Sequence, residues 1–169
     1  MKFPFEKKEK EILEKQEGTT DKNYGKNPKS RTLKESLDYG IININKPQGP
    51  SSHQVTDYVK KILQINKAGH SGTLDPNVTG SLIIALGRST RVIHNLLKAG
   101  KEYVCLMHIH TEQNENEIKQ AINSFVTKIE QMPPVRSAVK RRKRQREIYY
   151  IKTHEIKNNQ DVLFTVGCE

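Results

Sequence analysis

Cysteine is scarce in this sequence, and the only two, Cys105 and Cys168, lie far apart outside any CxxC or Cys/His pattern. This distribution supports neither a disulfide framework nor a structural zinc, so we expect two free thiols and no metal site. Long apolar runs are also missing. No stretch approaches the roughly 18 apolar residues of a membrane span, and the Lys- and Glu-rich start lacks the apolar centre of a signal peptide. We therefore expect a soluble, intracellular protein with no membrane partner.

Hydrophobic residues make up only 34% of the 169 residues and charged residues 28%, so part of the chain should lie outside a core. Lysine and arginine number 29 against 19 aspartates and glutamates, which gives a net charge of +10. A chain this basic favours a polyanionic partner, with nucleic acid first. The length suits one ordinary domain, and no internal repeat is visible.

The apolar residues are unevenly distributed along the chain. Residues 1–36 are mostly Lys, Glu, Asn, Thr and Gly, and we predict a basic, disordered arm there because they bury too little surface to offset chain entropy. Residues 37–169 are predicted to fold with mixed α+β structure. Strands are expected at 39–45, 82–86, 102–110, 148–156 and 162–166, and helices over 55–63, capped by Ser52, from Ser89 or Thr90 to Gly100, and over 118–125.

One acid stands almost alone in the stretch GHSGTLDPNVTG, residues 69–80. Asp75 precedes Pro76, and proline fixes its own backbone and extends the residue before it, so an ordered turn is predicted. Turn chemistry by itself favours a carboxylate that merely caps local backbone. The alternative is a carboxylate held rigidly for chemistry.

Six stretches in order bear on that choice: NINKPQGPSSHQV, KAGHSGTLDPNVTGSLIIAL, STRV, AGKEYVCLMHIH, QMPPVRSAVKRR and DVLFTVGCE. Together they make residues 37–169 resemble the TruB/dyskerin family of pseudouridine synthases, within it the archaeal and eukaryotic dyskerin-like branch. The resemblance implies the N-terminal part of that family's catalytic fold, with a mixed, mainly antiparallel sheet flanked by helices. It further implies a reaction that needs no cofactor.

The family isomerises uridine in RNA by breaking the glycosidic bond and rejoining the turned base through carbon 5. Asp75 matches its catalytic aspartate, acting as a nucleophile at the anomeric carbon or as a base at carbon 2′. Tyr103 matches the tyrosine beside the extruded base, although a lone tyrosine at a strand start is more often a core residue.

The resemblance also implies substrate- or RNA-binding residues. Lys46 matches a motif lysine that is either structural or phosphate-directed. His70 matches a position that supports the RNA, with a backbone-capping role as the alternative. The other positions expected to bind RNA are Gly72, Thr73 and Lys101.

Residues 140–146 form the basic run KRRKRQR. A run of this kind is usually a solvated face or loop. Beside these motifs we predict instead that it contacts phosphates, with Lys140, Arg141 and Arg142 in the binding set. After the final Glu169 the family pattern continues with an arginine segment that pairs with the catalytic aspartate and with a PUA domain. We expect a continuation or a second polypeptide to supply them.

Two functions follow as hypotheses. The first is a pseudouridine synthase acting on tRNA or, with an H/ACA guide RNA and small accessory proteins, on rRNA. The second is a non-catalytic RNA-binding fragment, or a partial gene product that needs a second polypeptide. The expected location is the cytoplasm of an archaeon or the nucleolus of a eukaryote.

Overall fold

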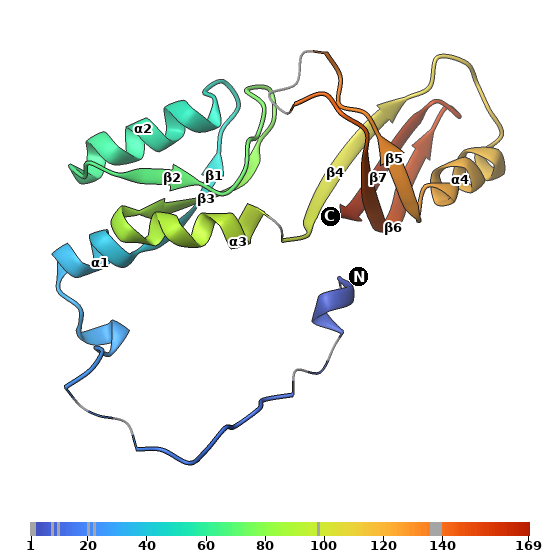
Figure 1. The fold of residues 1–169 in the computed structure, drawn as a ribbon. Coiled ribbons are helices and arrows are strands. Elements are labelled where there is room, and N and C mark those ends of the chain that lie inside the picture. Colours follow the sequence, from blue (N-terminus) through green and yellow to red (C-terminus); the bar gives the residue numbers. More distant parts are fainter. Residues whose placement is uncertain are drawn as a thin grey trace. The chain divides into compact units, whose positions relative to one another are not determined.

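The computed structural model describes residues 3–7, 9, 11–19, 21, 23–97, 99–135 and 140–169. The chain divides into two compact units, Glu14–Lys98 and a unit made of Met1–Leu13 with Ala99–Glu169. We name them the Asp75 unit and the Tyr103 unit after the two residues predicted to be catalytic. Both combine helices with antiparallel strands, which confirms the predicted α+β class (Figure 1).

The Asp75 unit is built on a small antiparallel sheet in the order β1-β3-β2. Its strands are β1 (Ile41–Lys46), β2 (Ala68–His70) and β3 (Gly80–Leu86). Its helices are α1 (Leu33–Tyr39), α2 (Ser52–Leu63), α3 (Ile93–Leu97) and the 3-10 turns η2 (Pro28–Ser30) and η3 (Gly87–Val92). Buried side chains of α2 and β3 form the core: Val55, Val59, Leu82, Ile84 and Leu86.

Helix α2 begins one residue earlier than its predicted cap implies. Ser51 is the N-cap and accepts a hydrogen bond from the Gln54 backbone N–H, while the Gln54 side chain accepts one from the Ser51 N–H. The predicted cap, Ser52, lies inside the helix and is completely buried. Because Ser51 is the cap, the Ser52 hydroxyl is available for a contact elsewhere in the fold.

Other elements of the Asp75 unit differ in length from the predictions. Strand β2 was not predicted, because its three residues fall in a Gly-rich stretch that reads as loop. The helix expected after Ser89 is a 3-10 turn followed by the short α3. Helix α1 starts at Leu33, ahead of the predicted ordered part, because Thr32 and Glu35 form a capping box at its N-terminus.

The Tyr103 unit contains a second antiparallel sheet, in the order β4-β7-β6-β5. Its elements are η1 (Pro4–Glu6), β4 (Lys101–His108), α4 (Glu115–Ser124), β5 (Lys128–Gln131), β6 (Arg144–Lys157) and β7 (Asp161–Cys168). Ile118 and Ile122 of α4 pack on Val162 of β7. The short strand β5 was not predicted, and β6 extends into the basic run.

The start of the chain contacts this unit. The Phe3 ring lies 5.9 Å from the Tyr149 ring and 5.7 Å from the Tyr150 ring, measured between centroids. Phe5 stacks on Phe3 at 5.1 Å. Within the described part of the chain, no helix is both long and apolar enough to cross a membrane.

Candidate active site

Asp75 is the first residue of a tight turn in the loop between β2 and β3. The Val78 N–H donates to the Asp75 carbonyl at 3.0 Å, with Pro76 in the second position of the turn, where its fixed φ is favourable. The side chain is exposed, and within the described residues of its unit nothing donates a hydrogen bond to its carboxylate. The local capping alternative is therefore not observed. Backbone atoms alone close this turn, so the Asp75 carboxylate is not needed to form it.

The residue before Asp75 is fixed from helix α2. The buried Ser52 hydroxyl accepts a hydrogen bond from the Leu74 N–H at 2.8 Å and donates one to the Leu74 carbonyl at 3.1 Å. The Leu74 side chain packs against the core of the unit. Both polar groups of this peptide backbone are thereby tied to one side chain 22 residues away in sequence.

The residue after Asp75 is fixed from the loop that follows β1. The Pro76 carbonyl accepts a hydrogen bond from the Gly49 N–H at 2.8 Å and a longer one from Lys46 Nζ at 3.5 Å. Gly49 has φ +113, a left-handed value that favours glycine. The Lys46 ammonium also donates to the carbonyls of Pro47 and Pro50, at 2.8 and 2.9 Å.

These contacts favour the structural one of the two roles predicted for Lys46. Its side chain is completely buried, and its ammonium can donate three hydrogen bonds, all of which have carbonyl acceptors in two adjoining loops. A phosphate would have to displace these carbonyls to reach it. Direct RNA binding by Lys46 stays a prediction, which its burial disfavours, and its contacts suit a role in holding the Asp75 loop in place.

His70 caps local backbone. Its Nδ1 lies 2.6 Å from the Gly72 carbonyl, so Nδ1 carries the proton and donates it. The His53 ring packs edge-on against the His70 ring at 4.7 Å. Burial lowers the pKa of His70, outweighing the opposite effect of the Gly72 hydrogen bond, and His53 adds to the lowering. The ring is thus neutral at pH 7 and leaves Nε2 as an acceptor.

The glycines of the loop have different roles. A side-chain carbon built on Gly69 would lie 2.7 Å from Cδ1 of Ile93, so that glycine allows α3 to pack against β2. One built on Gly72 would meet nothing within 4 Å, so this side of the backbone is open to a ligand. Thr73 is exposed beside it. Gly72 and Thr73 are accessible, and their binding to RNA stays a prediction.

Tyr103 lies on β4, paired with Val166 of β7, and its side chain is 40% exposed. Burial raises the pKa of its hydroxyl, and the nearby thiols of Cys168 and Cys105 contribute less. The hydroxyl therefore stays protonated at neutral pH, and no described residue hydrogen-bonds to it. Tyr103 and Asp75 lie in different units of the chain. Lys101, at the start of β4, donates to the Ala99 carbonyl at 3.0 Å.

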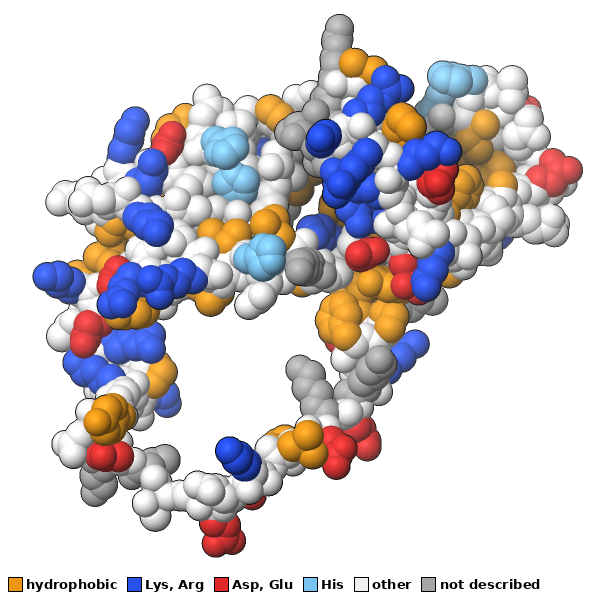
Figure 2. All heavy atoms as spheres, in the orientation of Figure 1, with side chains coloured by type: hydrophobic (Ala, Val, Ile, Leu, Met, Phe, Trp, Pro, Cys, Tyr) orange, Lys and Arg blue, Asp and Glu red, His pale blue; other side chains and the backbone are white. Residues whose placement is uncertain are grey.

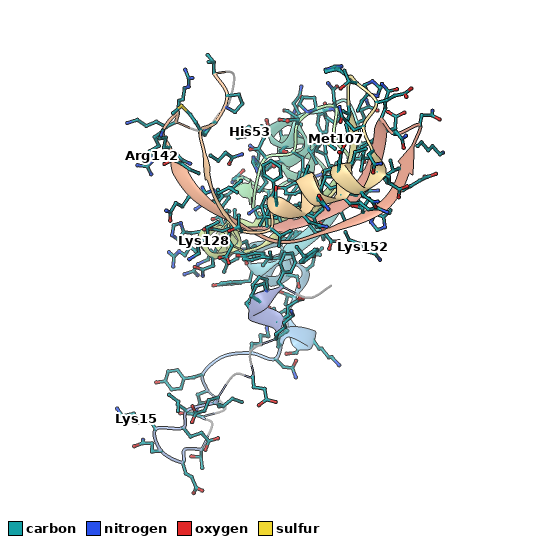
Figure 3. The ribbon with its side chains drawn as sticks, turned by 90° about the vertical axis from the view of Figure 1, so that its right-hand side faces the viewer. Lys15, His53, Met107, Lys128, Arg142 and Lys152 are labelled. Carbon is teal, nitrogen blue, oxygen red and sulfur yellow. The ribbon has the colours of Figure 1, made fainter. Side chains whose placement is uncertain are left out.

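The basic run divides into two parts. Lys140, Arg141 and Arg142 are exposed and have no acidic partner among the described residues. Figure 3 labels Arg142. Lys143 pairs with Glu130 at 2.8 Å, and Arg146 lies 3.7 Å from Glu169. The first part is therefore available to phosphates. Residues 136–139, within the motif that precedes it, lie outside the described residues.

No group of three His, Cys, Asp or Glu side chains within the described ranges is close enough together to hold a metal ion. Sequence reasoning missed Ser52 and Gly49 as functional residues. Both belong to KPQGPSS, which reads as an ordinary strand-to-helix connection. Their contacts to the residues on either side of Asp75 become visible only in the folded chain.

Comparisons with known proteins show what the chain is similar to. Residues 60–117 match the family model described as TruB family pseudouridylate synthase (N terminal domain), and residues 1–56 match the DKCLD (NUC011) domain. Proteins called probable tRNA pseudouridine synthase B in Methanopyrus kandleri and Nanoarchaeum equitans are each 48% identical over 99% of this chain. These alignments cover 49% and 47% of those proteins, so the chain spans about half the length of the curated relatives it matches.

Solved structures match as well. A Cbf5-Nop10-Gar1 complex contains a chain that matches with a TM-score of 0.83 at 50% identity, covering 89% of this chain and 46% of that one. An H/ACA RNP bound to a substrate RNA containing 2'-deoxyuridine contains another, with a TM-score of 0.78 at 45% identity, covering 89% of this chain and 44% of that one.

Proposed function

Because the chain belongs to the TruB/dyskerin family of pseudouridine synthases, of whose members it spans about half, we propose that it carries the catalytic aspartate of an RNA pseudouridine synthase. The observation that carries the proposal is the geometry at Asp75. Leu74 and Pro76 are both held by hydrogen bonds from the KPQGPSS segment, while the carboxylate between them is exposed and unpartnered within the described residues of its unit.

This arrangement suits a group that must meet a reacting sugar at a fixed angle. A rigid backbone supplies the orientation before the substrate arrives, which is where much of the rate gain of a positioned group originates. As a nucleophile, Asp75 would bond to carbon 1′ as the bond to N1 breaks, and C5 of the turned base would then displace the carboxylate. As a base, it would remove the proton on carbon 2′ as the bond to N1 breaks, and would return that proton to carbon 2′ as C5 bonds to carbon 1′. Both routes require the ionised carboxylate and end with carbon 1′ bonded to C5, with N1 protonated and the C5 proton released.

The proposed substrate is uridine in structured RNA. Relatives of this chain are called tRNA pseudouridine synthases, and the matching solved chains belong to complexes with Nop10 and Gar1 and to an H/ACA particle with substrate RNA. We propose tRNA, or rRNA selected by an H/ACA guide RNA with small accessory proteins. The runner-up is a non-catalytic RNA-binding fragment, favoured by the exposed cations Lys140, Arg141 and Arg142, which have no acidic partner in the part of the chain that the structure describes.

We also propose that activity requires a segment beyond this chain. A carboxylate enclosed with its substrate needs a cation to remain ionised, because desolvation raises the pKa of an acid. No lysine or arginine among the described residues of the Asp75 unit pairs with Asp75, and the relatives are about twice as long as this chain.

The deciding experiment is tritium release from RNA carrying uridine tritiated at C5, with the Asp75→Asn variant in whichever form of the protein is active. Turnover should disappear, while RNA affinity should stay within a few-fold, since the substitution removes charge but little volume. Asp57→Asn is the matched control, because Asp57 is also exposed and pairs with Lys60 at 2.6 Å on the surface of α2. Turnover above a tenth of wild type in Asp75→Asn would contradict the proposal.

A further inference from the structure

The Asp75 unit carries a positively charged surface, which lies at the end of its sheet opposite to Asp75. Strand β3 begins at Gly80, just after the Asp75 loop, and ends at Leu86, where Gly87 and Arg88 follow. At about 3.3 Å per residue, the strand separates the two ends by about 20 Å. Blue side chains gather at the end of the unit where α1 lies (Figure 2).

Two arginines are fixed there on one tyrosine. The Arg31 and Arg88 guanidiniums lie 5.8 and 5.3 Å from the centre of the Tyr39 ring. Arg88 also donates through Nη1 to the Tyr39 hydroxyl at 2.6 Å. A guanidinium has five N–H donors, so most of those on both arginines are left for a ligand. The tyrosine restrains the two forks before any ligand binds, which lowers the entropy lost on binding.

Gly87 allows the end of β3 to approach helix α1 closely. Its φ is +51, and a side-chain carbon at this position would lie 2.4 Å from Oδ1 of Asp38. The Arg88 backbone N–H then reaches Asp38 Oδ1 at 3.3 Å, which joins the end of β3 to helix α1. The placement of Arg88 therefore follows from the backbone and does not depend on a flexible loop.

A surface cavity of about 650 Å³ adjoins the arginine pair, between α1 and the turn of residues 64–67. Lys34 and Lys67 stand on its walls, and both are exposed. Leu37 and Ile65 contribute apolar lining. The cavity thus adds two cations to the two arginines on a surface that is already concave.

Two acids line the cavity, Glu35 and Asp38, and both accept hydrogen bonds. Glu35 accepts a hydrogen bond from Lys26 at 2.8 Å, and this bond together with those from Thr32 lowers the Glu35 pKa to about 2. Asp38 accepts the Arg88 backbone N–H. Among the described residues, none of the side chains of Arg31, Lys34, Lys67 and Arg88 has an acidic partner. Four cations therefore face solvent here, with Asp38 as the one nearby acid whose charge is not matched by a lysine.

We propose that Arg31, Lys34, Lys67 and Arg88 form a phosphate-binding surface in addition to that of residues 140–142. This surface binds the RNA backbone at a distance from the reacting nucleotide. Planar guanidiniums match phosphate oxygens in pairs, and lysines add point charges. A separation of about 20 Å exceeds the Debye length of about 8 Å at physiological salt, so these cations would attract phosphates near them and would act little on the nucleotide at Asp75. The inference rests on the proposed function for its ligand, RNA.

The test is a salt titration of binding to an unmodified tRNA transcript, comparing the whole chain with its Lys34→Gln/Lys67→Gln variant. Loss of two phosphate contacts should lower the slope of log K against log salt by about 1.4 to 1.8 in magnitude. At about 0.1 M salt, affinity should fall at least tenfold. Arg31→Gln, tested alone, should lower the slope by about 0.7 to 0.9.

Lys119→Gln/Lys157→Gln is the charge-matched control, because each of these exposed lysines already pairs with a neighbouring glutamate. A slope for Lys34→Gln/Lys67→Gln equal to that of the control, in protein with an unchanged circular dichroism melt, would overturn the inference. If polyglutamate binding were lost while the RNA slope stayed unchanged, the surface would belong to an acidic protein partner, which also overturns it. Binding is measured without turnover, so these outcomes are independent of whether Asp75 is catalytic.

Discussion

Replacing Ser52 by alanine removes the one side chain that holds both polar backbone groups of Leu74, the residue before Asp75. Alanine is favourable inside a helix, so α2 itself should persist. Ser51, with its capping box, still begins that helix. The substitution therefore perturbs the Asp75 loop and little else, and it tests whether Ser52 acts as a positioning residue.

The expected magnitude follows from the two lost hydrogen bonds, at 2.8 and 3.1 Å. Each contributes about 0.5–1.5 kcal/mol net, and the Leu74 groups facing the buried site lose their partner, so about 2 kcal/mol is lost. If this whole cost appears as disorder of the turn, the chemical step slows about 30-fold, because 1.36 kcal/mol is a factor of ten in rate. RNA affinity should change little, since Ser52 is completely buried.

The assay is single-turnover pseudouridine formation at saturating protein, together with a separate filter-binding Kd, in the form of the protein whose wild type is active. Ser81→Ala is the matched control, because the exposed Ser81 hydroxyl donates to Asn43 Oδ1 at 2.7 Å in the same sheet. Its rate should stay within about twofold of wild type. A Ser52→Ala protein that is folded, binds RNA normally and reacts within twofold of wild type would refute the reasoning.

Three further predictions concern stability, binding and pH. Lys46→Met should lower the free energy of unfolding, measured in urea, by about 3 kcal/mol or more, because three proline carbonyls lose a charged donor. Lys61→Met, at an exposed position, is the control and should change the free energy by no more than about 0.5 kcal/mol. Equal losses in the two variants would contradict the buried role of Lys46. Arg141→Gln/Arg142→Gln should lower the salt slope for a tRNA transcript by about 1.4 to 1.8, and an unchanged slope would remove the basic run from the RNA contact. The hydrogen bond to Glu102 raises the pKa of Tyr150 to about 12. The folded state therefore favours the neutral phenol of Tyr150. The stability that the folded protein gains from this hydrogen bond should be fully present below about pH 10 and should be lost as the pH rises toward about 12. Absorbance titration should show a lower Tyr150 pKa in Glu102→Gln, and an unchanged value would contradict the cause.

The sequence was sufficient for several properties that depend on neighbouring residues, although it misplaced the N-cap of α2. Periodicity located α2 and β3, because side-chain spacing reports which face is buried. Asp-Pro predicted the turn at Asp75, since proline restricts its own backbone and the residue before it. The motifs then identified the family, and with it Asp75 as the residue to examine. These predictions needed no knowledge of what lies across the fold.

Tertiary structure decided what depends on residues distant in sequence. Ser52 read as a helix cap and proved to hold Leu74, and Lys46 read as a possible phosphate ligand and proved to be buried under three carbonyls. The surface formed by Arg31, Lys34, Lys67 and Arg88 draws on three separate segments that the order β1-β3-β2 brings to one end of a sheet. Local sequence fixes the type of each residue and the conformation of the adjoining backbone. Burial and hydrogen-bond partners are set by packing between distant segments, so the roles of these side chains emerge only in the folded chain.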